Sequence, residues 1–270
     1  MMCTKWRTNA LVLTFLLAAS LPAAVITSGA LSVGIIDGNC AINNVSFMGN
    51  EYYRNGMFVS DFGFQVGTDV SSFALNTTLG ANPLGASVIS STPTTVTVAG
   101  VYFESGFTRF YQVIGGNTLE ITTMLTNTSG SSLLLRHFGS YDPDQGTPGG
   151  VGAGTYNDVN GLAASAQSLN LFHVVLGSLD PAAVVGFIPG SLGIFGGAQL
   201  NSHFAGPLDP NGAFSDIGFA IGKELNLAPG ETFSFTYTHV FSTIPEPATY
   251  VFVGAGLVVL GLLRRSRRNR

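Results

Sequence analysis

Charged residues are scarce in this chain. Asp, Glu, Lys and Arg make up 10% of its 270 residues, against about 25% in an average soluble domain. Positive charge is scarcest in the middle, where residues 31–244 contain four basic and 14 acidic side chains. Because binding to a phosphate backbone depends on clustered Lys and Arg side chains, this acidic region predicts no nucleic-acid partner.

Cysteine is also nearly absent. The chain has two cysteines, Cys3 and Cys40, and removal of an N-terminal leader would leave Cys40 alone. A single cysteine cannot form an intramolecular disulfide, so the disulfide framework that many exported domains use is excluded. We expect Cys40 to be buried as a small apolar side chain.

Local motifs of catalysis and metal binding are missing as well. The sequence has no G-x-S-x-G and no H-E-x-x-H, and its four histidines are at least 30 residues apart. These absences predict that the protein is not an enzyme. Glycoside hydrolysis stays open, because it needs only two carboxylates at a suitable separation, and the middle region has 14 candidates.

The N-terminus has the features of a secretory signal peptide. Two basic residues precede an apolar run from Ala10 to Leu21, which has the length of a signal-peptide core. The run stops at Pro22, short of the roughly 20 residues that span a bilayer. Small residues at Ser28–Ala30 fit a cleavage site, so we assign residues 1–30 to the leader and expect cleavage after Ala30.

The C-terminus, residues 242–270, combines three features in order. First come Pro245, Glu246 and Pro247, where the two prolines hold the backbone extended. An apolar stretch, residues 248–263, follows, and at about 1.5 Å per residue it predicts one short transmembrane helix. A basic cluster closes the chain, made of Arg264, Arg265, Arg267, Arg268 and Arg270. Such a cluster stays on the cytoplasmic side of the membrane, so the acidic domain lies outside.

Together these three features resemble the PEP-CTERM sorting signal of Gram-negative bacteria. The resemblance is confined to residues 242–270. It implies recognition by an exosortase, a membrane cysteine protease-transpeptidase that removes the tail. It implies further an exported protein that is anchored transiently in the inner membrane and then transferred to the cell surface or the extracellular matrix of a bacterium that makes exopolysaccharide.

The region between the two ends, residues 31–241, has the pattern of β-strands. Apolar and polar side chains alternate with period two in Thr118–Asn127 and Thr232–Phe241. Turns containing Gly, Asn or Pro separate further β-branched runs, and no segment has a sustained helical stripe. We therefore predict one all-β domain, a β-sandwich of the Greek-key or jelly-roll type. Its sequence indicates no named family.

One segment, Gly139–Gly161, is rich in Gly, Asp and Asn and predicts a long surface loop. Its carboxylates Asp142, Asp144 and Asp158 are candidate calcium ligands, because Ca²⁺ prefers several oxygen ligands on flexible loops. The alternative is that they are ordinary turn aspartates. No other cofactor is indicated.

Two functions are open for the domain. The first is a structural or adhesive surface protein associated with exopolysaccharide. The alternative is a secreted carbohydrate-binding module or carbohydrate-active enzyme with the same sorting tail. A cleft with two facing carboxylates would favour the alternative. Sugar rings could stack on exposed tyrosines, for which the candidates are Tyr52, Tyr53, Tyr111, Tyr141 and Tyr156, although aromatic residues of β-rich domains more often pack inside.

Overall fold

The computed structural model describes residues 22–36, 38–53, 60–142, 154–169, 172–188 and 193–243. Antiparallel β-sheet dominates these residues, which confirms an all-β class. The predicted sorting motif, transmembrane helix and arginine cluster lie outside the described residues, as does Asp144. Within the described ranges, no helix has the length and apolar character needed to cross a membrane.

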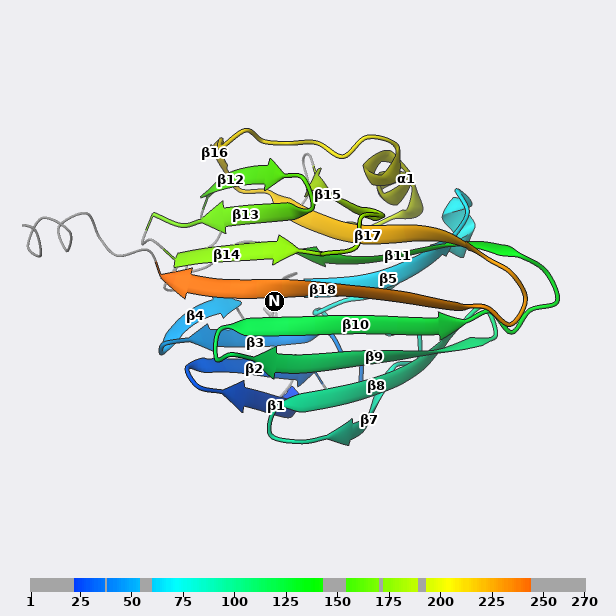
Figure 1. The fold of residues 1–270 in the computed structure, drawn as a ribbon, viewed down its shortest axis with the longest axis horizontal. Coiled ribbons are helices and arrows are strands. Elements are labelled where there is room, and N and C mark those ends of the chain that lie inside the picture. The colour runs from blue at the N-terminus through cyan, green and yellow to red at the C-terminus, as the bar shows by residue number, and fades with distance from the viewer. Residues whose placement is uncertain are drawn as a thin grey trace, which may run out of the picture.

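The described strands form three antiparallel sheets (Figure 1). The four-stranded sheet has the order β1 (Pro22–Ser28), β2 (Leu31–Ile36), β3 (Ile42–Phe47) and β4 (Asn50–Tyr53). The nine-stranded sheet has the order β16 (Phe214–Ser215), β12 (Thr155–Asn160), β13 (Ala163–Gln167), β14 (Phe172–Gly177), β18 (Thr232–Thr243), β10 (Thr118–Thr126), β9 (Ser105–Ile114), β8 (Thr95–Tyr102) and β7 (Ser87–Ser91). The five-stranded sheet has the order β15 (Ala183–Ile188), β17 (Gly218–Leu227), β11 (Leu133–Tyr141), β5 (Ser60–Val66) and β6 (Ala74–Asn76).

Strands β10 and β18 confirm the alternation that the sequence predicts. They are antiparallel neighbours in the middle of the nine-stranded sheet, with Ile121 opposite Tyr237. Alternate side chains are fully buried on one face, and those between them are partly exposed. Each strand therefore separates a dry inner face from a wet outer face, as a period-two pattern requires.

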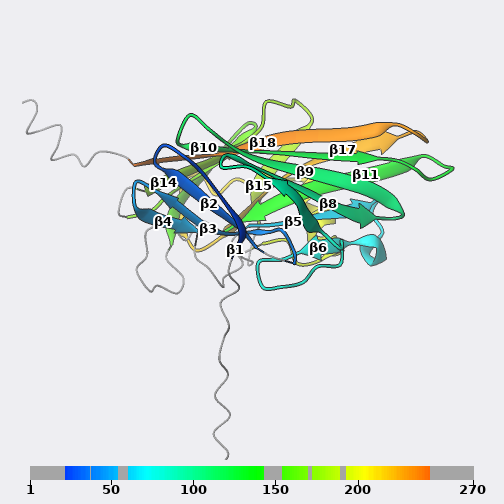
Figure 2. The same ribbon diagram turned by 90° about the horizontal axis from the view of Figure 1, so that it is seen from below.

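The inner face of the nine-stranded sheet packs against the five-stranded sheet, and Figure 2 shows the strands of both sheets from below. Phe107 of β9 contacts Phe64 of β5, with ring centroids 5.2 Å apart. The layers are in close contact at Gly139 of β11, where an added Cβ would lie 2.1 Å from the hydroxyl of Tyr237. Only glycine fits there, which explains this residue within a buried strand.

A fully buried arginine lies between these two layers. Arg109 of β9 donates hydrogen bonds to the hydroxyls of Tyr111, Thr123 and Tyr237, at 2.7–2.8 Å. His137 of β11 completes the group: its Nδ1 donates to a backbone carbonyl, so its Nε2 accepts from Arg109 at 3.2 Å. Burial and the Arg109 charge hold the pKa of His137 well below its ordinary value, so its ring is neutral.

The four-stranded sheet covers another part of the same inner face. Tyr52 of β4 donates to the backbone carbonyl of Ser242 at 2.7 Å and packs edge-to-face on Phe241, while the hydroxyl of Tyr53 hydrogen-bonds to His239. Cys40, between β2 and β3, is fully buried, as the sequence analysis expects.

Strand β1 falls inside the segment assigned to the leader. It pairs with β2 along its whole length, and its Ile26 is fully buried in the core. The expected cleavage point after Ala30 lies in the turn between the two strands. Cleavage there would remove β1 from the sheet, and the position of cleavage stays a prediction.

Two expectations about local structure are wrong. Helix α1 (Gly197–Ala205) was not expected, because nine residues make only two and a half turns and show little periodicity. It packs on the face of the five-stranded sheet turned away from the core, where Leu200 joins a small cluster with Phe138. The bounds of the expected loop Gly139–Gly161 are also wrong, because β11 continues to Tyr141 and residues Thr155–Asn160 form β12.

Candidate functional site

The outer face of the nine-stranded sheet carries a row of facing residues drawn from five strands. Glu120 of β10 lies opposite Thr238 of β18, and Thr238 lies opposite Gly177 of β14. Gly177 is paired with Ala163 of β13, which is paired in turn with Asn160 of β12. Because cross-strand partners share one face of a sheet, these five side-chain positions form a continuous line across the strands.

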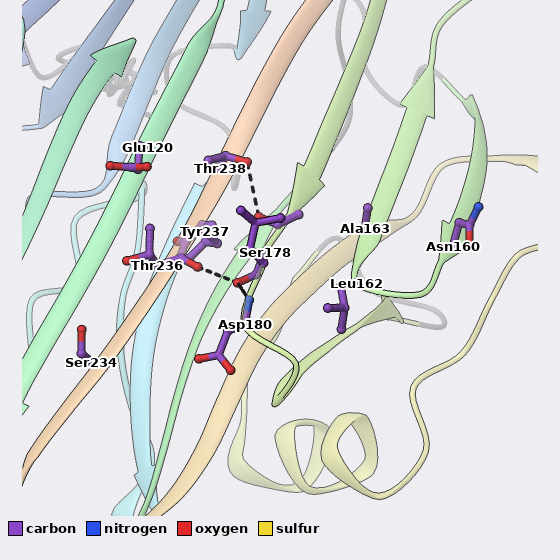
Figure 3. A pocket seen from close by; sticks show the side chains of 12 residues that line it. Glu120, Asn160, Leu162, Ala163, Ser178, Asp180, Ser234, Thr236, Tyr237 and Thr238 are labelled. Carbon is purple, nitrogen blue, oxygen red and sulfur yellow. Dashed lines mark hydrogen bonds between the residues drawn. The ribbon is translucent and has the colours of Figure 1, made fainter.

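A cleft of about 750 Å³ lies over this row (Figure 3). Its floor is low because Ala163 and Gly177 have almost no side chain, while larger residues such as Leu162 and Glu120 stand around it. The floor is closely packed, since a Cβ added to Gly177 would lie 3.3 Å from that of Ala163. The cleft is therefore a depression in the sheet surface that larger residues at these two positions would fill.

A short turn after β14 forms one wall of the cleft. Ser178 donates from its hydroxyl to the carbonyl of Thr236 at 2.6 Å and from its backbone to the carbonyl of Leu162 at 3.0 Å. The hydroxyl of Ser178 also accepts from the backbone N–H of Asp180 at 3.1 Å, as Figure 3 shows. These bonds tie the turn to β18 and to the turn between β12 and β13, so Asp180 is held at the cleft by the backbone around it.

Asp180 carries a fixed negative charge in the cleft wall. Its Oδ2 accepts from Nζ of Lys223 at 2.7 Å, and the same ammonium donates to the carbonyl of Ser234 at 3.1 Å. The Lys223 hydrogen bond lowers the pKa of Asp180 below its ordinary value. Asp180 therefore stays ionised at neutral pH and acts as a hydrogen-bond acceptor, not as a proton donor.

Glu120 supplies a second carboxylate from the opposite side of the cleft. It is partly exposed, and among the described residues no basic side chain forms an ion pair with it. Between the two carboxylates lie the hydroxyls of Ser234, Thr236 and Thr238. Carboxylate acceptors next to rotatable hydroxyls suit a ligand that has many hydroxyl groups of its own, since each such group both donates and accepts.

The calcium candidates lie on different elements. Asp142 is buried just after the end of β11, whereas Asp158 is exposed on β12 in the other large sheet. Asp144 lies outside the described residues. Within the described part of the chain, no three His, Cys, Asp or Glu side chains gather in a way that would hold a metal ion. The calcium site stays a prediction.

Four of the five candidate tyrosines are core residues. Tyr52, Tyr53, Tyr111 and Tyr141 are at most 1% exposed, and none of them can meet a sugar ring on the surface. Tyr156 differs, because 48% of its surface is exposed. The sequence could not separate these cases, since a tyrosine fits both faces of a strand.

Sequence reasoning did not single out Glu120 or Asp180. Glu120 stands at an outward position of the strongest alternating segment, which was a usable signal for exposure but not for a site. Asp180 lies in a Ser-Leu-Asp-Pro turn that resembles many others. Glu120 faces Thr238 and Asp180 binds Lys223, both more than 40 residues away in sequence, so only folding brings these groups together.

Comparison with known proteins shows similarity at the level of the fold. No protein-family model matches the chain, and no curated protein matches it. A galactose mutarotase-related enzyme from Lactobacillus acidophilus has a similar structure, with a TM-score of 0.54 over 83% of this chain and 98% of that one, at 13% identity. A bacterial glucoamylase solved with acarbose is similar at a TM-score of 0.55 and 12% identity, over 86% of this chain and 34% of that one.

This similarity contradicts the prediction that the protein is not an enzyme, because the chain has a fold found in an enzyme related to galactose mutarotases. The prediction failed because it relied on missing sequence motifs. Acid and base groups that act on sugars have no fixed spacing along a chain and are brought together by folding. The lack of a catalytic sequence motif therefore does not predict that a protein lacks catalytic activity.

Proposed function

We propose that this chain is an exported carbohydrate-active protein that binds a saccharide in the cleft above Glu120, Gly177 and Ala163. The observation that carries the proposal is the cleft itself, about 750 Å³ in volume and lined by two carboxylates and a row of hydroxyls. The similarity of the fold to sugar-related enzymes supports it independently.

Each part of the cleft matches one part of a saccharide. Sugar hydroxyls donate to the carboxylates of Glu120 and Asp180, which are stronger acceptors than neutral oxygens. The Asn160 amide provides both donors and an acceptor. Leu162 and Leu179 offer apolar contacts to the C–H groups of a sugar ring, and Leu179 is 99% exposed at the rim.

The test is the affinity of the purified full-length protein for a panel of soluble oligosaccharides and bacterial exopolysaccharides, measured by calorimetry. We expect Glu120→Gln to weaken binding about tenfold, because a charged hydrogen bond is lost, and Ala163→Met to abolish it by filling the floor. Glu51→Gln, which removes an exposed carboxylate on β4, is the control. Equal affinities for all three variants and the wild type would refute the site.

A catalytic function is the second candidate. It is favoured by the similarity to the mutarotase-related enzyme, which extends over 98% of that enzyme's length. Interconversion of sugar anomers requires a base that takes a proton from the anomeric hydroxyl and an acid that gives one to the ring oxygen as the ring opens. Glu120, the cleft carboxylate with no ion pair among the described residues, is the candidate base. Polarimetry of freshly dissolved galactose and glucose tests this directly. If the wild type and the Glu120→Gln variant interconvert the anomers at the same rate, catalysis by Glu120 is excluded.

The fold that we propose for the domain is a β-sandwich with Greek-key connections. Its support is the contact between the inner faces of the two large sheets and the path of the chain between them. Strand β10 belongs to the nine-stranded sheet, β11 to the five-stranded sheet and β12 to the nine-stranded sheet again. Such alternation between layers is typical of Greek-key sandwiches.

Export and sorting complete the proposal. The N-terminal leader directs the chain out of the cytoplasm, and the tail, residues 242–270, is recognised by an exosortase at the inner membrane. Exopolysaccharide at the cell surface is then the nearest source of saccharide. Deletion of residues 244–270 tests the sorting step: we expect the shortened protein in the medium or the periplasm, and unchanged fractionation would contradict it.

A further inference from the structure

Two exposed aromatic side chains lie together at one edge of the nine-stranded sheet. Tyr156 of β12 lies directly opposite Phe214 of β16, and their ring centroids are 5.0 Å apart. They are 48% and 47% exposed. Figure 1 shows the two strands side by side at this edge. Because the two exposed rings touch each other, they form a small apolar surface that a ligand could contact.

The backbone around this aromatic pair is held firmly. The side-chain amide of Asn157 donates to the carbonyls of Thr155 and Ser215, at 2.7 and 2.9 Å, and so joins β12 to β16. The ring of Phe214 lies against Gly154, where an added Cβ would be 2.7 Å from the ring edge. Because the two rings are already positioned, a ligand that contacts them orders little new structure on binding.

The aromatic pair faces the same side as the cleft. Along β12, Tyr156, Asp158 and Asn160 alternate outward, and Asn160 lines the cleft. Asn160 is four positions after Tyr156, and at about 3.4 Å per position the two are about 14 Å apart. The surface between them is polar, because Asp158 is opposite Ser165 and Tyr156 is opposite Gln167 on β13.

We propose that Tyr156 and Phe214 form a second saccharide subsite, so that a sugar chain lies along β12 from the cleft to the edge of the sheet. This rests on the proposed function of the cleft. A sugar ring has an apolar C–H face and a polar rim, and it matches aromatic rings beside a carboxylate and an amide. The continuous polar surface that leads to the cleft favours a saccharide chain over an apolar partner, for which Asp158 and Gln167 would be costly to bury.

A length series of oligosaccharides tests the subsite on the full-length protein. The probes are glucose oligomers from the monosaccharide to the hexasaccharide and soluble bacterial exopolysaccharide, measured by calorimetry. We expect Tyr156→Ala and Phe214→Ala each to lower the affinity for the longest ligands about tenfold, the loss of one aromatic contact, and to leave the affinity for the monosaccharide unchanged. Tyr156→Phe keeps the ring and should bind like the wild type.

Phe103→Ala is the matched control, because Phe103 is 54% exposed and lies in the turn between β8 and β9, two strands at the other side of the sheet. Both test residues are exposed, so an unchanged melting temperature confirms that the variants are folded. If the wild type binds and the cleft variants do not, but Tyr156→Ala binds every length like the wild type, the second subsite is refuted and the cleft stands. If the wild type binds no probe, both proposals fail.

Discussion

The inner and outer faces of the nine-stranded sheet use polar side chains in opposite ways. On the inner face, Arg109 and the hydroxyls around it are fully buried and satisfy one another. Two of those hydroxyls, of Thr123 and Tyr237, belong to β10 and β18. On the outer face, these two strands expose other hydroxyls and Glu120 at the cleft. Polar groups that bond to each other specify the fold, whereas polar groups that face water are available to a ligand. Substitutions on the two faces should therefore affect different properties.

The largest effect is expected at Arg109. Arg109→Ala removes the donors for Tyr111 and Tyr237 and leaves a cavity, so we expect the free energy of unfolding to fall by about 3–5 kcal/mol. Urea denaturation measures the loss. Arg109→Met keeps most of the volume, and the difference between the two variants separates packing from hydrogen bonding. A loss below about 1 kcal/mol would mean that the inner face does not depend on this group.

Gly139 tests how closely the two layers pack. Gly139→Ala places a methyl group against the hydroxyl of Tyr237, and we expect a loss of about 1–3 kcal/mol from overpacking. Tyr237→Phe in the same chain should recover part of that loss, and a double-mutant cycle measures the coupling. Gly130→Ala is the control, since a Cβ there meets nothing within 4 Å. If the stability losses of Gly139→Ala and Tyr237→Phe are additive, the added methyl group does not clash with the Tyr237 hydroxyl.

Asp61 of β5 extends the comparison to the other large sheet. Burial raises its pKa from 3.8 to about 6, although hydrogen bonds from Thr78 oppose the rise. Between these pH values the folded state holds the proton more tightly than the unfolded state, so stability falls as pH rises through this window and the full cost is present above pH 6. We expect Asp61→Asn to remove this part of the pH dependence.

Buried histidines act in the opposite direction, so the measurement must compare the variant with the wild type. Burial lowers the pKa of His203 to about 4 and that of His239 to about 3. In the unfolded state these histidines take up protons below about pH 6.5. The folded protein therefore becomes less stable as the pH falls. The melting temperatures of the wild type and Asp61→Asn, measured from pH 4 to 7, isolate the contribution of Asp61. If the two curves are parallel, Asp61 does not contribute to the pH dependence.

The smallest change in stability is expected on the outer face. Thr236→Ala removes a hydroxyl whose one side-chain bond among the described residues is to the Thr122 hydroxyl, at 2.8 Å, so we expect a change within about 0.5 kcal/mol. Saccharide affinity should nevertheless fall, because the hydroxyl lines the cleft. A stability loss as large as that at Gly139 would remove the distinction between the two faces.

Sequence patterns predicted the strands with one wet face and failed where both faces are covered or the element is short. The alternation in Thr118–Asn127 and Thr232–Phe241 gave β10 and β18 within a few residues. The last three residues of β11 were predicted to be loop, because Gly139 and Ser140 are typical of loops. Gly139 is instead a buried strand residue whose lack of a side chain leaves room for Tyr237. Helix α1 is too short for its sequence to show a periodic stripe of apolar residues.

The candidate site was beyond the reach of sequence reasoning. Its row of residues depends on the register of five strands, and Glu120 and Thr238 are more than 100 residues apart in the chain. The tyrosines illustrate the same limit, since burial separates Tyr156 from Tyr141 and no local pattern does. The prediction that the protein is not an enzyme failed for this reason, as it relied on local motifs alone.

Strand β18 determines how the domain would carry a mechanical load. It ends at Thr243, inside the segment 242–270 that we propose as the sorting tail, and it lies at the centre of the nine-stranded sheet. Its two neighbours, β10 and β14, both pair with it antiparallel. If that segment is held at the membrane, as we propose, a pull on it acts along a central strand and loads two ladders of hydrogen bonds in shear, so many bonds must break together before β18 leaves the sheet.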